Sequence, residues 1–135
     1  MQVILDTNIW VSGLLLPNSK AGLILVEWKK LSFDVVLSLY ILQEIERVLS
    51  YPKIEKRLKW DKNKIKHYVN LLSLFVDLRE DGQPLVHVPD DPNDSPILSL
   101  LLSSNSDYLI TGDRDLLKLQ LEYPILTLNQ FLEKI

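Results

Sequence analysis

Residues 2–8 read Gln-Val-Ile-Leu-Asp-Thr-Asn, a short apolar run that stops abruptly at three polar residues. An apolar run of this length, bounded by polar residues, is typical of a short buried strand. A second run of the same kind, Tyr-Leu-Ile-Thr at residues 108–111, is closed by Gly112 and Asp113. Both segments therefore predict a buried strand that is followed directly by an aspartate.

Helical and strand patterns alternate between these two segments. Apolar residues at helical spacing predict helices at 21–31 and 39–49, and a β-branched run predicts a strand at 34–37. The other expected elements are an apolar segment at 9–16, two helices within 53–76, a strand at 85–88, a helix at 94–104, a helix at 116–121, a strand at 125–128 and a helix at 130–134. Strands separated by helices imply crossovers and a parallel sheet covered on both faces. We predict an α/β fold, a three-layer α/β/α sandwich with a central, mainly parallel sheet, as a single domain over residues 1–135.

Composition excludes several classes of protein. The chain has 135 residues, of which 47% are hydrophobic, enough for the core of one ordinary domain. It has no cysteine, which excludes disulfides, thiolate zinc sites and a cysteine nucleophile. No apolar run approaches the ~20 residues that span a bilayer, and no positively charged leader opens the chain. We therefore expect a cytoplasmic protein without a membrane partner.

Charge is unevenly distributed along the chain. The net charge is −3, but residues 53–66 hold seven basic and two acidic residues, so this segment is +5 and the rest is −8. The basic residues are Lys53, Lys56, Arg57, Lys59, Lys62, Lys64 and Lys66. A molecule polarised in this way can bind phosphate on one side and cations on the other. The alternative interpretation is an ordinary solvated helical face.

Carboxylates recur where the predicted strands end. Asp6 follows the first strand, Asp94 opens a helix after the expected strand at 85–88, and Asp113 and Asp115 follow the strand at 108–111. Ligand sites of parallel sheets form beyond the carboxyl ends of the strands. Several carboxylates in one place remain ionised only beside a positive charge. Mg²⁺ prefers oxygen ligands and can activate water for phosphodiester hydrolysis.

Each acid also has an ordinary explanation. The aspartates could cap helices, and Glu44 could pair with Arg47 three residues later. Capping does not explain why three strands each end in an acid, or why Glu44 borders an apolar helical face. Periodicity alone does not separate Glu44 from Glu46, because both flank the same apolar stripe.

Several motifs resemble those of PIN domains, the fold of many toxin ribonucleases. They are Ile-Leu-Asp-Thr-Asn at residues 4–8, Ser38 with Glu44 six residues on, Asp-Pro-Asn-Asp at 91–94, and Tyr-Leu-Ile-Thr-Gly-Asp-Arg-Asp-Leu-Leu at 108–117. They stand in the family's order and at its approximate spacing over essentially the whole chain. The sequence looks closest to the VapC-like toxins of toxin–antitoxin pairs.

This resemblance assigns roles to individual residues. It implies four catalytic, metal-binding acids, namely Asp6, Glu44, Asp94 and Asp113. It implies auxiliary roles for Asn8, Thr111, Asp115 and Asp91. In this scheme Mg²⁺ or Mn²⁺ is the cofactor, and Glu44 positions or deprotonates a water that attacks an RNA phosphodiester, leaving a 5′-phosphate and a 3′-hydroxyl. Glu44 is chosen over Glu46 from the family pattern alone.

The expected partners follow from the same resemblance. RNA is the expected substrate, steered by Lys53, Lys56, Arg57 and Lys59, and three aromatic side chains are candidates for base stacking: Trp10, Tyr40 and Trp60. The family also implies a cognate antitoxin protein and a homodimer. The helices at 21–31 and 39–49 are candidate interface surfaces, although each could equally serve the core.

Other α/β classes fit the sequence less well. A haloacid-type phosphatase needs an aspartate where Asn8 stands, and a phospho-acceptor receiver needs a lysine after the strand at 125–128. No Gly-x-x-x-x-Gly-Lys motif is present, which excludes a P-loop NTPase. A catalytically degenerate PIN-like module that binds protein or RNA remains as the alternative function.

Overall fold

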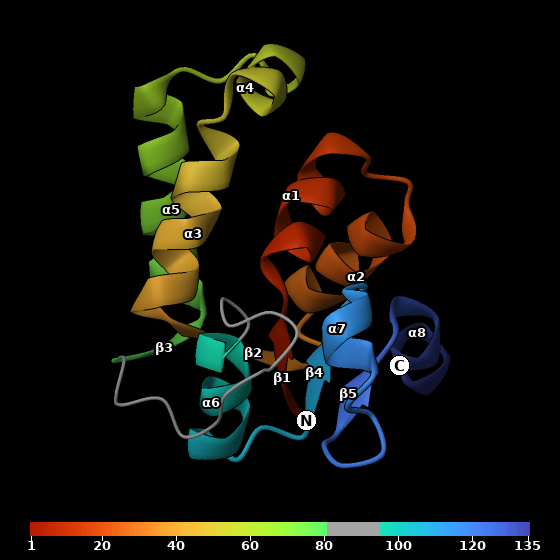
Figure 1. Cartoon of the computed structure of the whole chain (residues 1–135). Coiled ribbons are helices and arrows are strands. Elements are labelled where there is room, and N and C mark those ends of the chain that lie inside the picture. The colour runs from red at the N-terminus through yellow and green to blue at the C-terminus, as the bar shows by residue number, and fades with distance from the viewer. Residues whose placement is uncertain (81–94) are drawn as a thin grey trace.

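A computed structural model describes residues 1–80 and 95–135 of the chain. Five parallel strands form one sheet in the order β3-β2-β1-β4-β5 (Figure 1). The strands are β1 (Gln2–Leu5), β2 (Asp34–Ser38), β3 (Asp77–Arg79), β4 (Tyr108–Ile110) and β5 (Ile125–Leu126). The predicted α/β/α fold with a parallel central sheet is confirmed.

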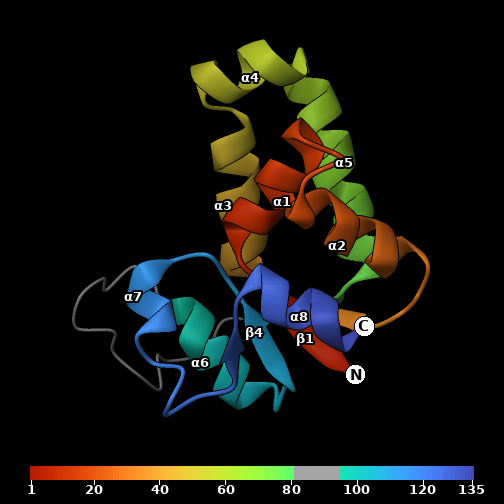
Figure 2. The same ribbon diagram turned by 90° about the vertical axis from the view of Figure 1, so that its right-hand side faces the viewer.

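Helices connect the strands and cover the sheet. They are α1 (Thr7–Leu15), α2 (Lys20–Lys29), α3 (Leu39–Leu49), α4 (Pro52–Leu58), α5 (Lys62–Phe75), α6 (Ser95–Ser103), α7 (Arg114–Leu117) and α8 (Leu128–Lys134). Helix α6 packs against β2 and β4, whereas α8 packs against β5 and α2. Helices α3 and α5 pack side by side and extend beyond the sheet, with α4 at their far end (Figures 1 and 2).

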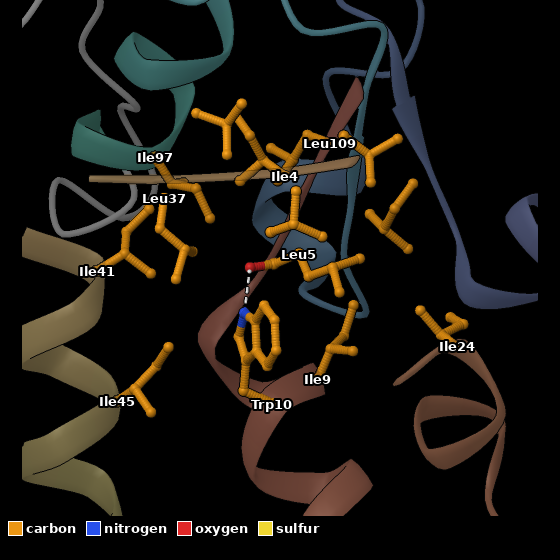
Figure 3. Close-up of a cluster of buried hydrophobic side chains, with 14 of the residues drawn as sticks. Ile4, Leu5, Ile9, Trp10, Ile24, Leu37, Ile41, Ile45, Ile97 and Leu109 are labelled. Carbon is orange, nitrogen blue, oxygen red and sulfur yellow. Dashed lines mark hydrogen bonds between the residues drawn. The ribbon is translucent and has the colours of Figure 1, made fainter. Parts of the chain in front are cut away.

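The central strands form the middle of the core. Val3, Ile4 and Leu5 of β1 are completely buried, which explains why this strand is apolar throughout rather than alternating. Figure 3 shows Leu5 above Trp10, the buried indole of α1. The indole Nε1–H donates a hydrogen bond to the carbonyl oxygen of Leu5 at 3.2 Å. This bond fixes the first helix against the carboxyl end of the first strand.

Polar residues at the strand ends are the N-caps of the helices that follow. The Asp6 carboxylate accepts from the backbone N–H of Thr7, and the Ser38 hydroxyl accepts from that of Ile41. Asp113 caps α7 in the same way. The capping interpretation is therefore confirmed for Asp6 and Asp113, and the helix N-termini begin where the parallel strands end.

Two secondary-structure elements, β3 and α7, differ clearly from expectation. Strand β3, Asp77–Arg79, was not predicted because three exposed residues at the sheet edge give no apolar pattern. The helix expected at 116–121 is the single turn Arg114–Leu117, since the chain turns after Lys118 and leaves Leu121 fully exposed. The strand expected at 85–88 lies outside the described residues. The two helices expected within 53–76 are confirmed as α4 and α5.

Within residues 1–80 and 95–135, no single helix is long and apolar enough to cross a membrane. Only α1 and α2 together meet that criterion by length and composition, and they are bent by 97° relative to each other.

Candidate active site

Two of the predicted acids lie at the carboxyl ends of neighbouring strands. Strands β1 and β4 pair in parallel, so Asp6 and Asp113 leave the sheet at the same edge. The backbone N–H of Asp6 donates to the carbonyl oxygen of Ile110 at 3.1 Å, which continues the strand pairing to the site itself. The topology thus joins two residues that are more than 100 positions apart in the sequence.

Thr111 links these two acids through its side chain. Its buried hydroxyl donates to one Asp6 carboxylate oxygen at 2.7 Å and accepts the backbone N–H of Asp113 at 3.0 Å. The other Asp6 oxygen accepts the N–H of Thr7 at 2.8 Å. Thr7 was not singled out from the sequence, although its position after a capping aspartate is the signal that could have identified it. Both Asp6 oxygens are therefore held by donors.

The surroundings of Asp6 oppose its negative charge. Burial is the main cause that raises the pKa of the Asp6 carboxyl above its ordinary value of 3.8. Hydrogen bonds from Thr111 and Thr7 act in the opposite direction, and the charges of Asp113 and Glu44 raise the pKa further. The charges of Glu44 on α3 and of Asp113 at the start of α7 are thus each close enough to the Asp6 carboxylate to repel it.

The structure distinguishes Glu44 from Glu46. Glu44, half-buried on α3, acts electrostatically on Asp6, whereas Glu46 does not. The Glu44 carboxylate forms no hydrogen bond or ion pair with Arg47, or with any other residue in the described part of the chain. The ordinary Glu44–Arg47 pairing is therefore wrong, and the Glu44 carboxylate is available to the group of acids around Asp6.

The auxiliary residues divide into three groups. Thr111 is at the centre, and Asp115 donates its backbone N–H to the Asp113 carboxylate at 2.9 Å while its own carboxylate lies 3.7 Å from the Lys118 ammonium. Asn8 is exposed on the first turn of α1 and makes no hydrogen bond to these acids. Asp91 and Asp94 lie outside the described residues.

In the two described segments, no three acidic or imidazole side chains are grouped tightly enough to hold a metal ion. Asp6, Glu44 and Asp113 therefore form a looser group than a three-ligand metal centre. Their chemistry still suits a hard divalent cation, because all their potential ligand atoms are carboxylate oxygens and their mutual repulsion favours a positive charge among them.

The predicted basic residues on and after α4 lie away from this edge of the sheet, whereas Trp10 lies close to it but inside the core (Figure 1). Lys53, Lys56 and Arg57 are exposed on α4, and Lys59 follows its end. Trp10 has no exposed surface and packs edge-on against Trp28, with ring centroids 5.1 Å apart, so its predicted stacking on bases is wrong. One face of each candidate interface helix packs into the core, through Ala21, Ile24, Leu25, Ile41, Leu42, Ile45 and Leu49.

We expect Thr111→Val to destabilise the fold by about 1–3 kcal/mol, because the change leaves Asp6 without one donor and the Asp113 N–H without an acceptor. Urea denaturation measures the loss. Thr111→Ser, which keeps the hydroxyl, is the matched control and should recover most of the stability. Equal stability of the valine and serine variants would contradict the role of the hydroxyl.

Comparisons with known proteins give one family and two relatives. The sequence model of the PIN domain matches residues 2–115. An uncharacterized protein of Methanocaldococcus jannaschii is 29% identical over 139 residues, covering 100% of this chain and 85% of that protein. The fold is similar to a chain in the crystal structure of VapBC2 from Rickettsia felis bound to a DNA fragment from their promoter. That match has a TM-score of 0.61 at 15% identity and covers 94% of this chain and 98% of the other.

Proposed function

Because the chain belongs to the PIN-domain family, we propose that it is a Mg²⁺- or Mn²⁺-dependent endoribonuclease. The observation that carries this proposal is the convergence of Asp6, Glu44 and Asp113, from three separate parts of the chain, to within electrostatic range. Capping accounts for Asp6 and Asp113 but not for the approach of Glu44 to Asp6, and a buried carboxylate with a raised pKa and acidic neighbours is typical of functional sites.

The proposed metal ligands are Asp6, Glu44, Asp94 and Asp113. A bound divalent ion supplies a positive charge that lowers the pKa of water and offsets the charge of the reacting phosphate. Within the described residues, the direct ligands would come from Asp6 and Asp113, whose positions the Thr111 hydroxyl fixes relative to each other. Asp94 and Asp91 belong to this proposal from the sequence alone.

Glu44 has a separate role in the proposed reaction. Its carboxylate has no hydrogen-bond partner in the described part of the chain, so it is free to accept a proton from, or orient, a water that attacks the phosphorus. Hydrolysis by this water would leave a 5′-phosphate on one RNA fragment and a 3′-hydroxyl on the other. The exposed lysines and arginine of residues 53–66 would attract the RNA electrostatically.

Incubation of the purified protein with single-stranded RNA and Mg²⁺ or Mn²⁺ tests the proposal. Glu44→Gln should lower the cleavage rate by ~100-fold or more, since proton transfer by a positioned side chain contributes about that much. Glu46→Gln, the same change two residues away, should keep near wild-type activity. Equal losses in the two variants would remove Glu44 from the mechanism, and chelation by EDTA should stop cleavage by the wild-type protein.

We further propose that the protein is the toxin of a type II toxin–antitoxin pair, held inactive by a cognate antitoxin and acting as a homodimer in the cytoplasm. The similar fold in the VapBC2 structure supports this placement. Sedimentation at micromolar concentration tests the dimer, and co-purification with the product of the adjacent reading frame tests the antitoxin. A monomer in the first experiment would contradict the dimer.

The alternative is a degenerate PIN-like module that binds RNA or protein without cutting. The absence of a tight three-ligand group in residues 1–80 and 95–135 favours it. It predicts no cleavage of any RNA with either metal. Metal-dependent cleavage that Glu44→Gln abolishes would exclude it.

A further inference from the structure

A separate pocket lies at the junction of α4 and α5. It has a volume of about 490 Å³ and is lined by Pro52, Glu55, Lys56, Lys59, Trp60 and Asp61. We call it the α4–α5 pocket. Helix α4 lies at the end of α3 and α5 that points away from the sheet, so this pocket is distinct from the carboxylates around Asp6 (Figures 1 and 2). A volume of this size is within the range of small-molecule sites.

The local sequence builds the pocket by breaking one helical stretch into two. Lys59 ends α4 in the left-handed conformation, with φ of 60°, and the Asp61 carboxylate caps α5 by accepting the Lys64 N–H at 2.8 Å. Between them, the Trp60 ring packs against Tyr68 with centroids 5.3 Å apart, and the Lys64 ammonium lies 5.1 Å from the Trp60 ring centroid. The indole is therefore held in place at the pocket rather than free in solvent.

The pocket offers three kinds of contact within one site. Trp60 presents an aromatic surface, Lys56 and Lys59 present positive charges, and Glu55 and Asp61 present carboxylates. The surrounding segment at residues 53–66 has a net charge of +5 in a chain of −3, so an anionic polymer is attracted to this end of the molecule.

We propose that the α4–α5 pocket holds one unpaired nucleotide of an RNA strand. Trp60 contacts the base, Lys56 and Lys59 contact the flanking phosphates, and the carboxylates of Glu55 and Asp61 accept hydrogen bonds from amino groups of the base. Unpaired bases are recognised in this manner, by aromatic contact and by hydrogen bonds to their exposed edges. This inference rests on the proposed function, because it takes RNA as the substrate.

An unpaired nucleotide accounts for the mixed lining better than other anions do. A free phosphate would use the lysines but would be repelled by Glu55 and Asp61. An acidic peptide would meet the same carboxylates and would have no need of Trp60. A base with an amino group, and guanine above all, offers adjacent N–H donors to a carboxylate, whereas uracil offers a single one. The pocket should therefore favour guanine over uracil.

The pocket lies within reach of a strand bound at the carboxylates. Helix α3 runs from the sheet to Leu49, and α4 begins at Pro52. Pro52 follows Glu44 by eight positions, which corresponds to roughly 12 Å at the helical rise per residue. Stacked nucleotides are spaced by about 3.4 Å along one strand, so the held nucleotide would be about three or four positions from the cleaved bond.

Tryptophan fluorescence of the full chain in EDTA tests the pocket without any cleavage. Guanosine 5′-monophosphate should quench the emission of Trp60, and Trp60→Phe, which keeps an aromatic ring against Tyr68, should remove the quenching. Trp10 is fully buried and should not respond, whereas Trp28 is only partly buried, so any response of Trp28 would remain as quenching in Trp60→Phe. Quenching that persists in Trp60→Phe, or none in the wild type, would overturn the proposal.

A matched pair of lysine variants separates a pocket from general charge attraction. Binding of a fluorescent eight-nucleotide RNA in EDTA should weaken by ~5–10-fold in Lys56→Ala, which removes a charge-assisted contact in the pocket. Lys62→Ala removes the same charge from an exposed residue of the same segment that does not line the pocket, and should weaken binding less than ~2-fold. Equal losses of RNA affinity in Lys56→Ala and Lys62→Ala would show diffuse electrostatic attraction and would overturn the proposed nucleotide site.

Base preference gives the last arm of this test. Guanosine 5′-monophosphate should bind more tightly than uridine 5′-monophosphate, and Glu55→Gln should reduce that difference. Equal affinity for the two nucleotides would contradict the role of the carboxylates. Since all three measurements are made in EDTA, binding without later cleavage would refute the proposed nuclease but not the pocket, whereas cleavage without pocket binding would do the reverse.

Discussion

Replacing Asp6 with asparagine is expected to lower metal-dependent RNA cleavage by at least ~1,000-fold, since it removes a central charge from the proposed ion-binding group. The fold should survive. Asparagine is an equally good N-cap, and its amide oxygen can still accept from the Thr7 N–H or the Thr111 hydroxyl. Cleavage of a labelled RNA, followed under conditions where the wild type is fully converted, measures the loss.

Asp107→Asn is the matched control for this change. Asp107 accepts the backbone N–H of Gln2 at 2.8 Å from an exposed position at the start of β4, where the strand enters the sheet rather than leaves it. The control removes the same charge and should leave cleavage within ~2-fold of wild type, as expected for a surface change away from the reaction. Residual activity of Asp6→Asn near that of the control would remove Asp6 from the active site.

Asp6→Asn should also make the metal-free protein more stable at neutral pH. Because the pKa of Asp6 is raised in the folded state, the folded protein binds this proton more tightly than the unfolded chain does. The stabilising contribution of the Asp6 carboxyl is fully present below pH 3.8, its pKa in the unfolded chain. This contribution is lost as the pH rises through the pKa of Asp6 in the folded protein. Asparagine has no such loss, so we expect Asp6→Asn to unfold at a higher urea concentration and at a higher Tm than wild type at pH 7.

The stability gain separates a functional charge from a structural one. Denaturant titrations in EDTA at pH 7 and pH 3.5 measure it, and the difference between Asp6→Asn and wild type should shrink at the lower pH. A variant less stable than wild type at both values would mean that Asp6 serves mainly to hold the fold together. Higher stability together with lost cleavage would be the pattern expected of a strained catalytic group.

The sequence predicts those parts of the site that depend on strand ends. Apolar runs that stop at a polar residue mark where β1 and β4 leave the sheet, and parallel pairing then brings Asp6 and Asp113 to one edge. Capping does not exclude the proposed catalytic role. Asp6 caps α1 with one oxygen and accepts the Thr111 hydroxyl with the other, so the cap and the contact toward Asp113 use different oxygens.

Helical periodicity could not choose between Glu44 and Glu46, because both flank the same apolar stripe at similar angles. The choice depends on where α3 crosses the sheet edge, which is a property of packing between α1 and α3. Strand β3 escaped prediction for a related reason: three exposed residues pair with β2 through their backbone, which carries no side-chain signal. Contacts between elements, rather than local sequence patterns, therefore determine both the choice between Glu44 and Glu46 and the presence of β3.

Trp10 shows how a sequence pattern can misplace an aromatic residue. From the sequence, Trp10 is a candidate for stacking on unpaired RNA bases, together with Tyr40 and Trp60. The structure turns the indole inward, where it joins α1 to the end of β1 (Figure 3). There it packs against Trp28 of α2. Trp10 thus holds the end of β1, the strand that leads to Asp6, from within the core.

Trp10→Ala should therefore affect both stability and activity. Removing a fully buried tryptophan costs about 3–5 kcal/mol, and the Leu5 carbonyl oxygen also loses its indole donor. Urea denaturation measures the first effect. Trp10→Phe, which keeps a ring but loses the donor, should cost about half as much and leave the protein folded.

Trp10→Phe also tests whether Trp10 keeps Asp6 in position. Asp6 lies between Leu5 and α1, so loosening the Trp10–Leu5 contact should shift the Asp6 carboxylate relative to Asp113. We expect Trp10→Phe to cleave RNA ~10-fold more slowly than wild type even where denaturation shows it fully folded, because small displacements of reacting groups are costly. Leu14→Ala, a change on the same helix but further from the strand end, should lower stability without this loss of rate. Wild-type cleavage by a folded Trp10→Phe would mean that the Thr111 hydroxyl and the Thr7 N–H alone are sufficient to hold Asp6 in place.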